Sequence, residues 1–188
     1  MVNHKKFSEI YRAMAKSAKN QIEQDENKLL DELTKNSKEN IDTMAKNCGF
    51  SRQKAWRMVK KLEKDQKIWG YTAIVDEEKK GLNKFMILIK RSTQPLEQKT
   101  ADTIANGQLD SVYAKLGIAI ESSYYLHGDY DWAIIFTAQD LRNAKRLSNM
   151  LVENYPGVIE KMSLLRVLFS QREHRIFNPN PTKLREFL

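Results

Sequence analysis

The sequence predicts an α+β chain in which a helical first part is followed by a second part with the order βαββαβ. Two observations lead to this prediction. Apolar residues recur every three or four positions as far as about residue 64, which is typical of amphipathic helices. After residue 83, short apolar runs of strand length alternate with two helical stretches.

Length and composition fit this division. The chain has 188 residues, enough for one domain or two small ones, and 41% of them are hydrophobic, so a core can be buried. The net charge of +8 favours an anionic partner, either nucleic acid or an anionic membrane surface. Mixed charges and a buried core predict a folded globular protein.

The expected compartment is the cytoplasm. No apolar run approaches the roughly 18 residues of a membrane-spanning helix, and the N-terminal segment has no apolar signal region. A single cysteine, Cys48, allows no intrachain disulfide and favours a reducing environment. We expect Cys48 to be a small core side chain and expect no association with membranes.

Three helices are predicted before residue 48. Residues 3–22 form the first, with an apolar stripe of Phe7, Ile10, Met14, Ala18 and Ile22. The second is expected to begin near Asp25, because acidic side chains suit the first turn of a helix, and to end near Asn36. The third covers residues 40–47.

A tight turn and a basic helix follow. Gly49 separates residues 40–47 from a helix over 52–64, and Ser51 stands where its side chain can cap the free amides of that helix. The stripe of Ala55, Met58, Val59 and Leu62 is expected to pack inward. Residues 68–75, around Gly70, are expected to form a hairpin wing. The pattern predicts a winged helix-turn-helix, which places its second helix in the major groove of double-stranded DNA.

Charge supports the same partner. From Ser51 to Lys67 there are seven basic and two acidic side chains, so this segment carries a net +5 of the total of +8. Near the start of the basic helix, glutamine and arginine suit base edges, whereas the lysines suit phosphates. The alternative is an ordinary solvated helical face. The candidate DNA-binding residues are Ser51, Arg52, Gln53, Lys54, Trp56, Arg57, Lys60, Lys61 and Lys64.

An outward Trp56 in this set has two interpretations. Its ring can wedge against the DNA backbone or cover a neighbouring helix of the same chain.

The second part predicts a ferredoxin-like domain. Its strands are expected at residues 85–89, 118–126, 132–136 and 158–169, and its helices at 95–105 and 140–154. Gly128 and Asp129, after His127, predict a tight hairpin turn. The predicted organisation is a helical extension over 1–24, a winged helix-turn-helix over 25–80, a ferredoxin-like domain over 81–173 and a tail over 174–188.

The sheet of this domain predicts self-association. Its first and third strands are apolar at nearly every position, as in strands buried on both faces. Two helices cover only one face of a four-stranded sheet. A second copy is expected to cover the other face, giving a homodimer that can assemble further into a tetramer or octamer.

Both parts together resemble the Lrp/AsnC, or feast/famine, family of transcriptional regulators. The resemblance spans residues 25–173 and rests on LLDEL at 29–33, Gly49-Phe50-Ser51, IWGYTAIVD at 68–76 and GDYD at 128–131. It implies DNA binding, dimers or larger assemblies, and a small-molecule effector, commonly an amino acid, bound near the GDYD turn. The implied effector residues are Gly128, Asp129, Tyr130 and Asp131.

The sequence departs from this family in two places. Lys67 precedes the expected wing where a glycine is usual, and Lys161, Met162 and Ser163 replace the usual threonines before the last strand. The second departure puts an amino-acid ligand in question.

Two other functions remain open. One is an architectural DNA-binding protein of weak specificity, and the other is an enzyme of the sirohaem decarboxylase type, which shares this plan. His4, His127 and His174 are scattered without ligand spacing, so we expect no metal site, no cofactor and no catalytic residues.

Overall fold

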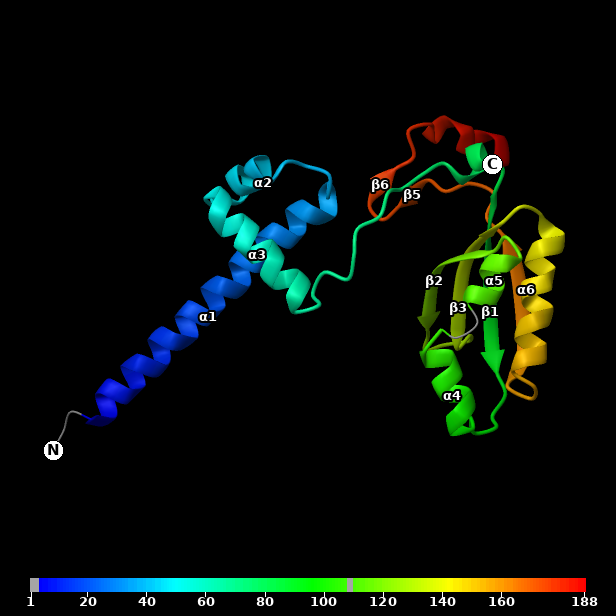
Figure 1. Ribbon diagram of the computed structural model, residues 1–188, viewed down its shortest axis with the longest axis horizontal. Coiled ribbons are helices and arrows are strands. Elements are labelled where there is room, and N and C mark those ends of the chain that lie inside the picture. The colour runs from blue at the N-terminus through cyan, green and yellow to red at the C-terminus, as the bar shows by residue number, and fades with distance from the viewer. Residues whose placement is uncertain (1–3, 108–109) are drawn as a thin grey trace. The chain divides into compact units, whose positions relative to one another are not determined.

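The computed structural model describes residues 4–107 and 110–188 (Figure 1). The chain forms two compact units, which are described separately. Unit 1 comprises Met1–Ile74 and Arg172–Phe177, and unit 2 comprises Val75–Gln171 and Asn178–Leu188. The assignment of residues 172–177 to unit 1 was not predicted from the sequence.

Unit 1 is built from three helices: α1 (His4–Lys35), α2 (Ile41–Cys48) and α3 (Arg52–Lys64). Its core brings together one or two apolar side chains from each helix, namely Leu29, Met44, Ala45, Ala55 and Leu62. Cys48 packs against this core as expected, and burial raises the pKa of its thiol. The strand pair β5 (Arg172–Glu173) and β6 (Ile176–Phe177) belongs to the same unit, and Arg175 Nη1 donates to Thr34 Oγ1 at 3.0 Å.

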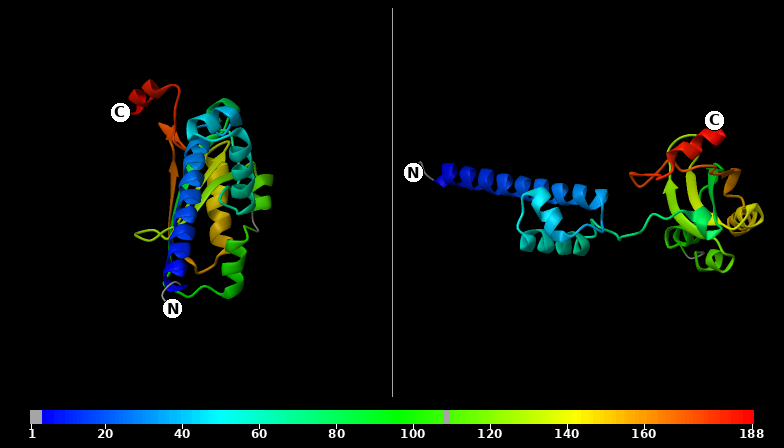
Figure 2. Two further views of the ribbon diagram at one scale, coloured as in Figure 1. Left: turned by 90° about the vertical axis from the view of Figure 1, so that its left-hand side faces the viewer. Right: turned by 90° about the horizontal axis from the view of Figure 1, so that it is seen from above.

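The prediction of two helices before residue 36 is wrong, because α1 is one continuous helix of 32 residues (Figure 2). Neither Gly nor Pro interrupts it. Asp25 and Glu26, whose acidic side chains suggested a helix start, lie in the interior of α1. Met14 and Ile22, from the predicted apolar stripe, are largely exposed. The side chains of Phe7 and Ile10 lie outside the part of the chain whose side chains the structure describes.

The predicted hairpin of the wing is also wrong. Residues 67–76 form no strand, and their backbone N–H groups from 69 to 76 donate to no backbone carbonyl of the described chain. A hairpin needs two runs with a turn between them, whereas Gly70 alone interrupts a single extended run. The side chain of Trp69 is 96% exposed.

Unit 2 has the predicted ferredoxin-like plan. Its strands are β1 (Asn83–Arg91), β2 (Ala119–Tyr125), β3 (Trp132–Ala138) and β4 (Ile159–Arg166). They pair antiparallel in the order β2-β3-β1-β4, with Ile87 opposite both Ile134 and Leu164. The helices are α4 (Gln98–Ala105), α5 (Asp110–Lys115) and α6 (Leu141–Asn154), and the short α5 was not predicted.

The three helices of unit 2 cover one face of the sheet (Figure 2). Phe85, Ile87, Ile89, Ile134 and Phe136 point toward them and are buried, with Tyr113, Leu147 and Leu151 from the helices. The alternate positions form what we call the open face, which contains Met86, Leu88, Ile135 and Leu165. Leu165 is 46% exposed, so the open face presents apolar surface.

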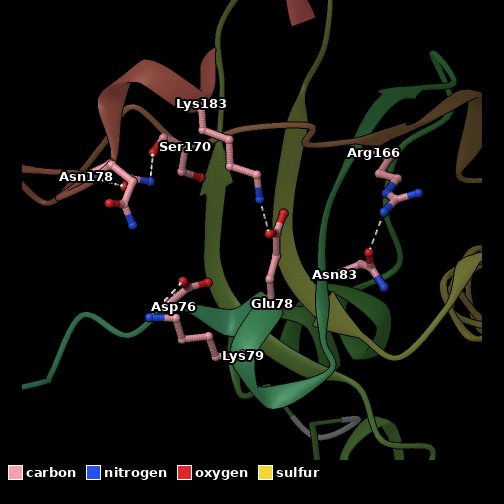
Figure 3. A network of polar contacts seen from close by, with 9 residues as sticks. Asp76, Glu78, Lys79, Asn83, Arg166, Ser170, Asn178 and Lys183 are labelled. Atoms are coloured by element: carbon pink, nitrogen blue, oxygen red, sulfur yellow. Dashed lines mark hydrogen bonds and ion pairs between the residues drawn. The ribbon is translucent and has the colours of Figure 1, made fainter. Parts of the chain in front are cut away.

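The remaining elements of unit 2 are held by polar contacts (Figure 3). A 3₁₀ helix η1 (Glu77–Lys80) precedes β1, and another, η2 (Pro181–Phe187), lies within the residues predicted as a tail. Lys183 Nζ of η2 lies 2.5 Å from Glu78 Oε2 of η1, and Asn178 Nδ2 donates to the Ser170 carbonyl at 3.0 Å. Residues 178–188 are therefore anchored to unit 2.

Candidate nucleic-acid interface

The turn between α2 and α3 has the predicted local structure. Asn40 caps α2 through its side chain, which accepts from the Asp42 amide at 2.9 Å. Gly49 ends α2 with a left-handed φ of +73°, a conformation that costs a glycine little. Ser51 Oγ then accepts from the Lys54 amide at 3.2 Å and starts α3. The capping role predicted for Ser51 is confirmed.

The inner side of α3 also follows the prediction. Ala55 and Leu62 are fully buried, and Met58 and Val59 pack against the core of unit 1. This apolar stripe fixes the rotation of α3 about its axis. The opposite side of the helix must therefore face outward.

We call that opposite side the outer face of α3. It carries five side chains spaced three or four residues apart, so they lie next to one another on the helix: Gln53, Trp56, Arg57, Lys60 and Lys64. All five are exposed, and Trp56 exposes 56% of its surface. Trp56 therefore does not cover a neighbouring helix within the described chain.

Arg52 is exposed at the start of α3, with Nε 3.5 Å from the carboxylate of Asp42. Lys60 pairs with Glu63 one turn further along, at 2.8 Å. Both are exposed ion pairs, which contribute little to stability and exchange readily for another anion.

Two lysines from the predicted set lie beside the outer face, on the flank of α3 that adjoins α1. Lys54 Nζ lies 2.5 Å from Asp25 Oδ2, and Lys61 Nζ lies 2.7 Å from Glu26 Oε1. Lys67 Nζ completes the group at 2.5 Å from Glu26 Oε2. We call these five residues the acid–lysine clamp, because they join α1 to α3 and to the residues just after it.

Both acids of the clamp are buried, with 7% of Asp25 and 3% of Glu26 exposed. Hydrogen bonds from Lys61 and then Lys67 lower the pKa of Glu26, against the opposing effect of burial. The hydrogen bond from Lys54, followed by one from Gln21, lowers the pKa of Asp25. The carboxylates therefore stay ionised and keep two lysine heads of α3 turned toward α1.

The predicted effector residues are brought together in one connection, between β2 and β3. Asp131 fixes this turn to β1: its carboxylate accepts from the Arg91 amide at 2.8 Å, and its own amide donates to the Ile89 carbonyl at 2.9 Å. Tyr130 Oη lies 3.5 Å from Ser163 Oγ. Gly128 and Asp129 are exposed at the tip. Asp131 thus has a structural role, and the effector role of the four residues stays a prediction.

In residues 4–107 and 110–188, no three or more His, Cys, Asp or Glu side chains gather as metal ligands would. Within the same part of the chain, no helix is long and apolar enough to cross a membrane.

Comparisons with known proteins identify the fold. No protein-family model matches the chain. No curated protein matches it in sequence. Among solved structures, the leucine response regulatory protein LrpA of Mycobacterium tuberculosis is 20% identical with a TM-score of 0.60, over 82% of this chain and 98% of its own.

Two further solved structures are similar over 79% of this chain. An AsnC family transcriptional regulator from Agrobacterium tumefaciens is 17% identical, with a TM-score of 0.59 and 92% of its own chain covered. A transcriptional regulator of Neisseria meningitidis, in complex with L-methionine, is 16% identical, with a TM-score of 0.59 and 91% of its chain covered. The fold of this chain is therefore that of Lrp- and AsnC-type regulators.

Proposed function

We propose that this chain, which has the fold of Lrp- and AsnC-type regulators, is a DNA-binding transcriptional regulator. The observation that carries the proposal is the outer face of α3, where exposed cationic side chains, a glutamine and a tryptophan lie together on a helix positioned by a capped turn. This is the composition expected of a helix that enters the major groove.

Within this face, the residues divide by chemistry. Gln53 and Arg57 suit adenine and guanine edges, whereas Lys60 and Lys64 suit phosphates, as do the exposed Arg52 and the Ser51 end of the helix. Lys54 and Lys61 contribute positive potential, but we propose that their main contribution is indirect, through the clamp that sets the angle of α3 on α1.

The test is a pair of double charge reversals with matched net charge. Arg57→Glu with Lys60→Glu alters the outer face of α3, and Arg142→Glu with Lys145→Glu alters exposed positions of α6. Binding to a mixed-sequence DNA duplex is measured by fluorescence anisotropy at fixed salt. We expect the α3 variant to lose roughly tenfold or more in affinity, and the α6 variant to lose much less. Equal losses would contradict a specific role for α3.

We propose a small-molecule effector as the input of this regulator. The turn of Gly128, Asp129, Tyr130 and Asp131 is the candidate contact region, and an amino acid is the first candidate class, as in the Neisseria meningitidis complex with L-methionine. Titration of L-amino acids into the protein–DNA complex tests this class, with a change in DNA affinity or in oligomeric state as the expected result.

We also propose that two copies associate through the open face. The apolar side chains of Met86, Leu88, Ile135 and Leu165 support this, because a monomer would leave them in contact with water. Two copies would present two α3 helices to paired half-sites of DNA, consistent with a regulator that binds as a dimer.

A further inference from the structure

Unit 2 contains a cavity of about 200 Å³ on the helix-covered side of its sheet. Its walls are mostly apolar and come from α4, from the loop before it and from the sheet, with Ile89, Leu96, Ile104, Trp132 and Ile159 among them. The volume is below the roughly 300–1,000 Å³ of sites that hold drug-sized ligands, so an occupant would be smaller.

One cation, Arg91, lies on the wall of this cavity. Its Nη1 donates to the Tyr125 hydroxyl at 2.6 Å, and Tyr125 lines the same cavity. Its Nε is buried and has no hydrogen-bond partner among the described residues. The Nη1 end of the guanidinium and the Tyr125 side chain are exposed, so the positive charge lies at the solvent edge of the cavity.

No anion of the described chain compensates this charge. Among the side chains that the structure describes (residues 14–107 and 111–188), no carboxylate forms an ion pair with the Arg91 guanidinium. The nearby carboxylate of Asp131 is engaged elsewhere, because it accepts from the backbone amide of Arg91. The Nη groups of Arg91 can therefore bind an anion at the edge of an apolar cavity, whereas the buried Nε has no surface that a ligand could reach.

This combination selects a class of ligand. A guanidinium binds a carboxylate well, because its N–H groups match the two carboxylate oxygens. The apolar walls suit a hydrocarbon tail. Among the described lining residues there is no Asp or Glu, so an α-ammonium group would enter without a partner. The site therefore favours a carboxylate without an amino group over an amino acid.

We propose that this cavity binds a small apolar monocarboxylate, of the arylacetate or branched-chain alkanoate class, with its carboxylate on Arg91 and Tyr125 and its tail under α4. The site adjoins the Gly128–Asp131 turn, since Tyr125 and Trp132 flank that turn and Asp131 holds the backbone of Arg91. A role as effector site rests on the proposed function, whereas binding itself does not.

Binding is tested by isothermal titration calorimetry of the full chain without DNA, using phenylacetate, 4-methylpentanoate, phenylacetamide and L-phenylalanine as probes. We expect saturable binding of at least one of the two carboxylates. The neutral phenylacetamide and the ammonium-bearing L-phenylalanine should each bind about tenfold or more weakly than phenylacetate. Absence of saturable binding by both carboxylates would overturn the proposal, and equal affinity for phenylacetamide or L-phenylalanine would overturn its assignment of ligand class.

Variants locate the site. Arg91→Met removes the cation, and Ala101→Phe fills the cavity from α4 without touching the cation. Both should lose about tenfold or more in carboxylate affinity, whereas Arg142→Met, at an exposed arginine of α6, should bind as the parent chain does. Unchanged affinity in Ala101→Phe, with the fold verified by circular dichroism, would place the binding elsewhere.

The two proposals fail separately. If phenylacetate binds and the α3 charge reversal leaves DNA affinity unchanged, the DNA-binding function is wrong and the cavity assignment stands. If DNA binding depends on α3 and neither carboxylate binds, the cavity assignment is wrong and the DNA-binding function stands.

Discussion

At the scale of single residues, Glu26 decides how α3 is held. It lies in the interior of α1, almost without exposure, and accepts hydrogen bonds from two lysines that follow it by 35 and 41 residues. In an isolated helix, an acidic residue at this position would be an ordinary solvent-exposed residue. Its role becomes visible only when α3 supplies the counter-charges.

Substitution Glu26→Gln should destabilise unit 1 by about 1–3 kcal/mol, because it removes the negative charge opposite two lysines and its amide nitrogen cannot accept the second lysine hydrogen bond. Hydrogen exchange of α1 and α3 peptides, read by mass spectrometry, measures the opening free energy of this unit. The control is Glu160→Gln, which removes a half-exposed partner of Lys90 at 3.6 Å and should leave α1 and α3 unchanged. Equal exchange in the two variants would contradict the clamp.

The same carboxylates predict a pH dependence with a definite sign. The pKa values of Asp25 and Glu26 are lowered in the folded chain from ordinary values of 3.8 and 4.5. The unfolded chain then binds more protons at acidic pH, so stability falls as pH falls. The contribution is fully present above the ordinary pKa values and is lost as pH falls through the lowered ones. Urea unfolding followed by circular dichroism between pH 6 and pH 3 should show this loss, and it should be smaller in Glu26→Gln.

At the scale of elements, local patterns predicted most of the structure. The strands of unit 2, the turn at Gly49, the cap of α3 and the inward stripe of α3 depend on neighbouring residues, and these predictions are confirmed. The clamp was not predictable, because its partners are distant in sequence and no periodic pattern marks them. The same acids misled the prediction of a helix start at Asp25, since acidic side chains are favourable both at helix starts and opposite lysines.

The segment 67–76 shows a related limit of sequence reasoning. The β-branched and aromatic side chains of Ile68, Trp69 and Tyr71 favour a strand, yet a strand requires a partner, which this segment lacks in the described chain. The local sequence pattern indicates that a segment favours a strand conformation, but it does not indicate whether another strand is available to pair with it.

The candidate site was predictable only in part, for a physical reason. Helical periodicity identified the outer face of α3 and the turn identified its capped start, whereas the Arg91 cavity depends on side chains from separate elements. No spacing in the sequence indicates that Arg91 and Leu96 line the same cavity as Ile159. A charged residue at the end of an apolar strand was the one available signal.

The exposed backbone of residues 67–76 predicts where a protease cuts first. The N–H groups of residues 69–76 lack backbone partners in the described chain and Trp69 is almost fully exposed, so chymotrypsin can bind this segment in an extended conformation without unfolding either unit. Brief digestion and mass spectrometry should give first cuts after Trp69 or Tyr71. Replacement of both by Ser should slow that cleavage strongly. Earlier cleavage within α6 or β3 would show that the segment is protected.

At the scale of the whole molecule, the open face of unit 2 is the feature that bears on assembly. The sheet has helices on one side only, and alternate residues of β1, β3 and β4 place apolar side chains on the other. A surface of this kind is typically covered by another protein surface. A symmetric pairing of two such faces is the simplest closed arrangement.

This pairing is tested by two matched substitutions. Leu165→Asp places a charge on the open face, whereas Val152→Asp places one on an exposed apolar position of α6. Because both positions are about half exposed in the single chain, neither change should prevent folding. Light scattering after size-exclusion chromatography should give a monomer for Leu165→Asp and a dimer for Val152→Asp. A dimer in both variants would exclude the open face as the interface.

The discontinuity of unit 1 has a consequence for biosynthesis. Its helices are complete by residue 74, but the β5–β6 pair that belongs with them, and the Arg175 side chain that binds Thr34, follow about a hundred residues later. At about 5–20 residues per second, a ribosome needs roughly 5–20 s to supply them. During that interval the helical unit exists in a partial form, and all of unit 2 up to Gln171 is synthesised before unit 1 can be finished. Unit 1 therefore cannot be completed before Phe177, and unit 2 cannot be completed before its last segment, Asn178–Leu188, has followed.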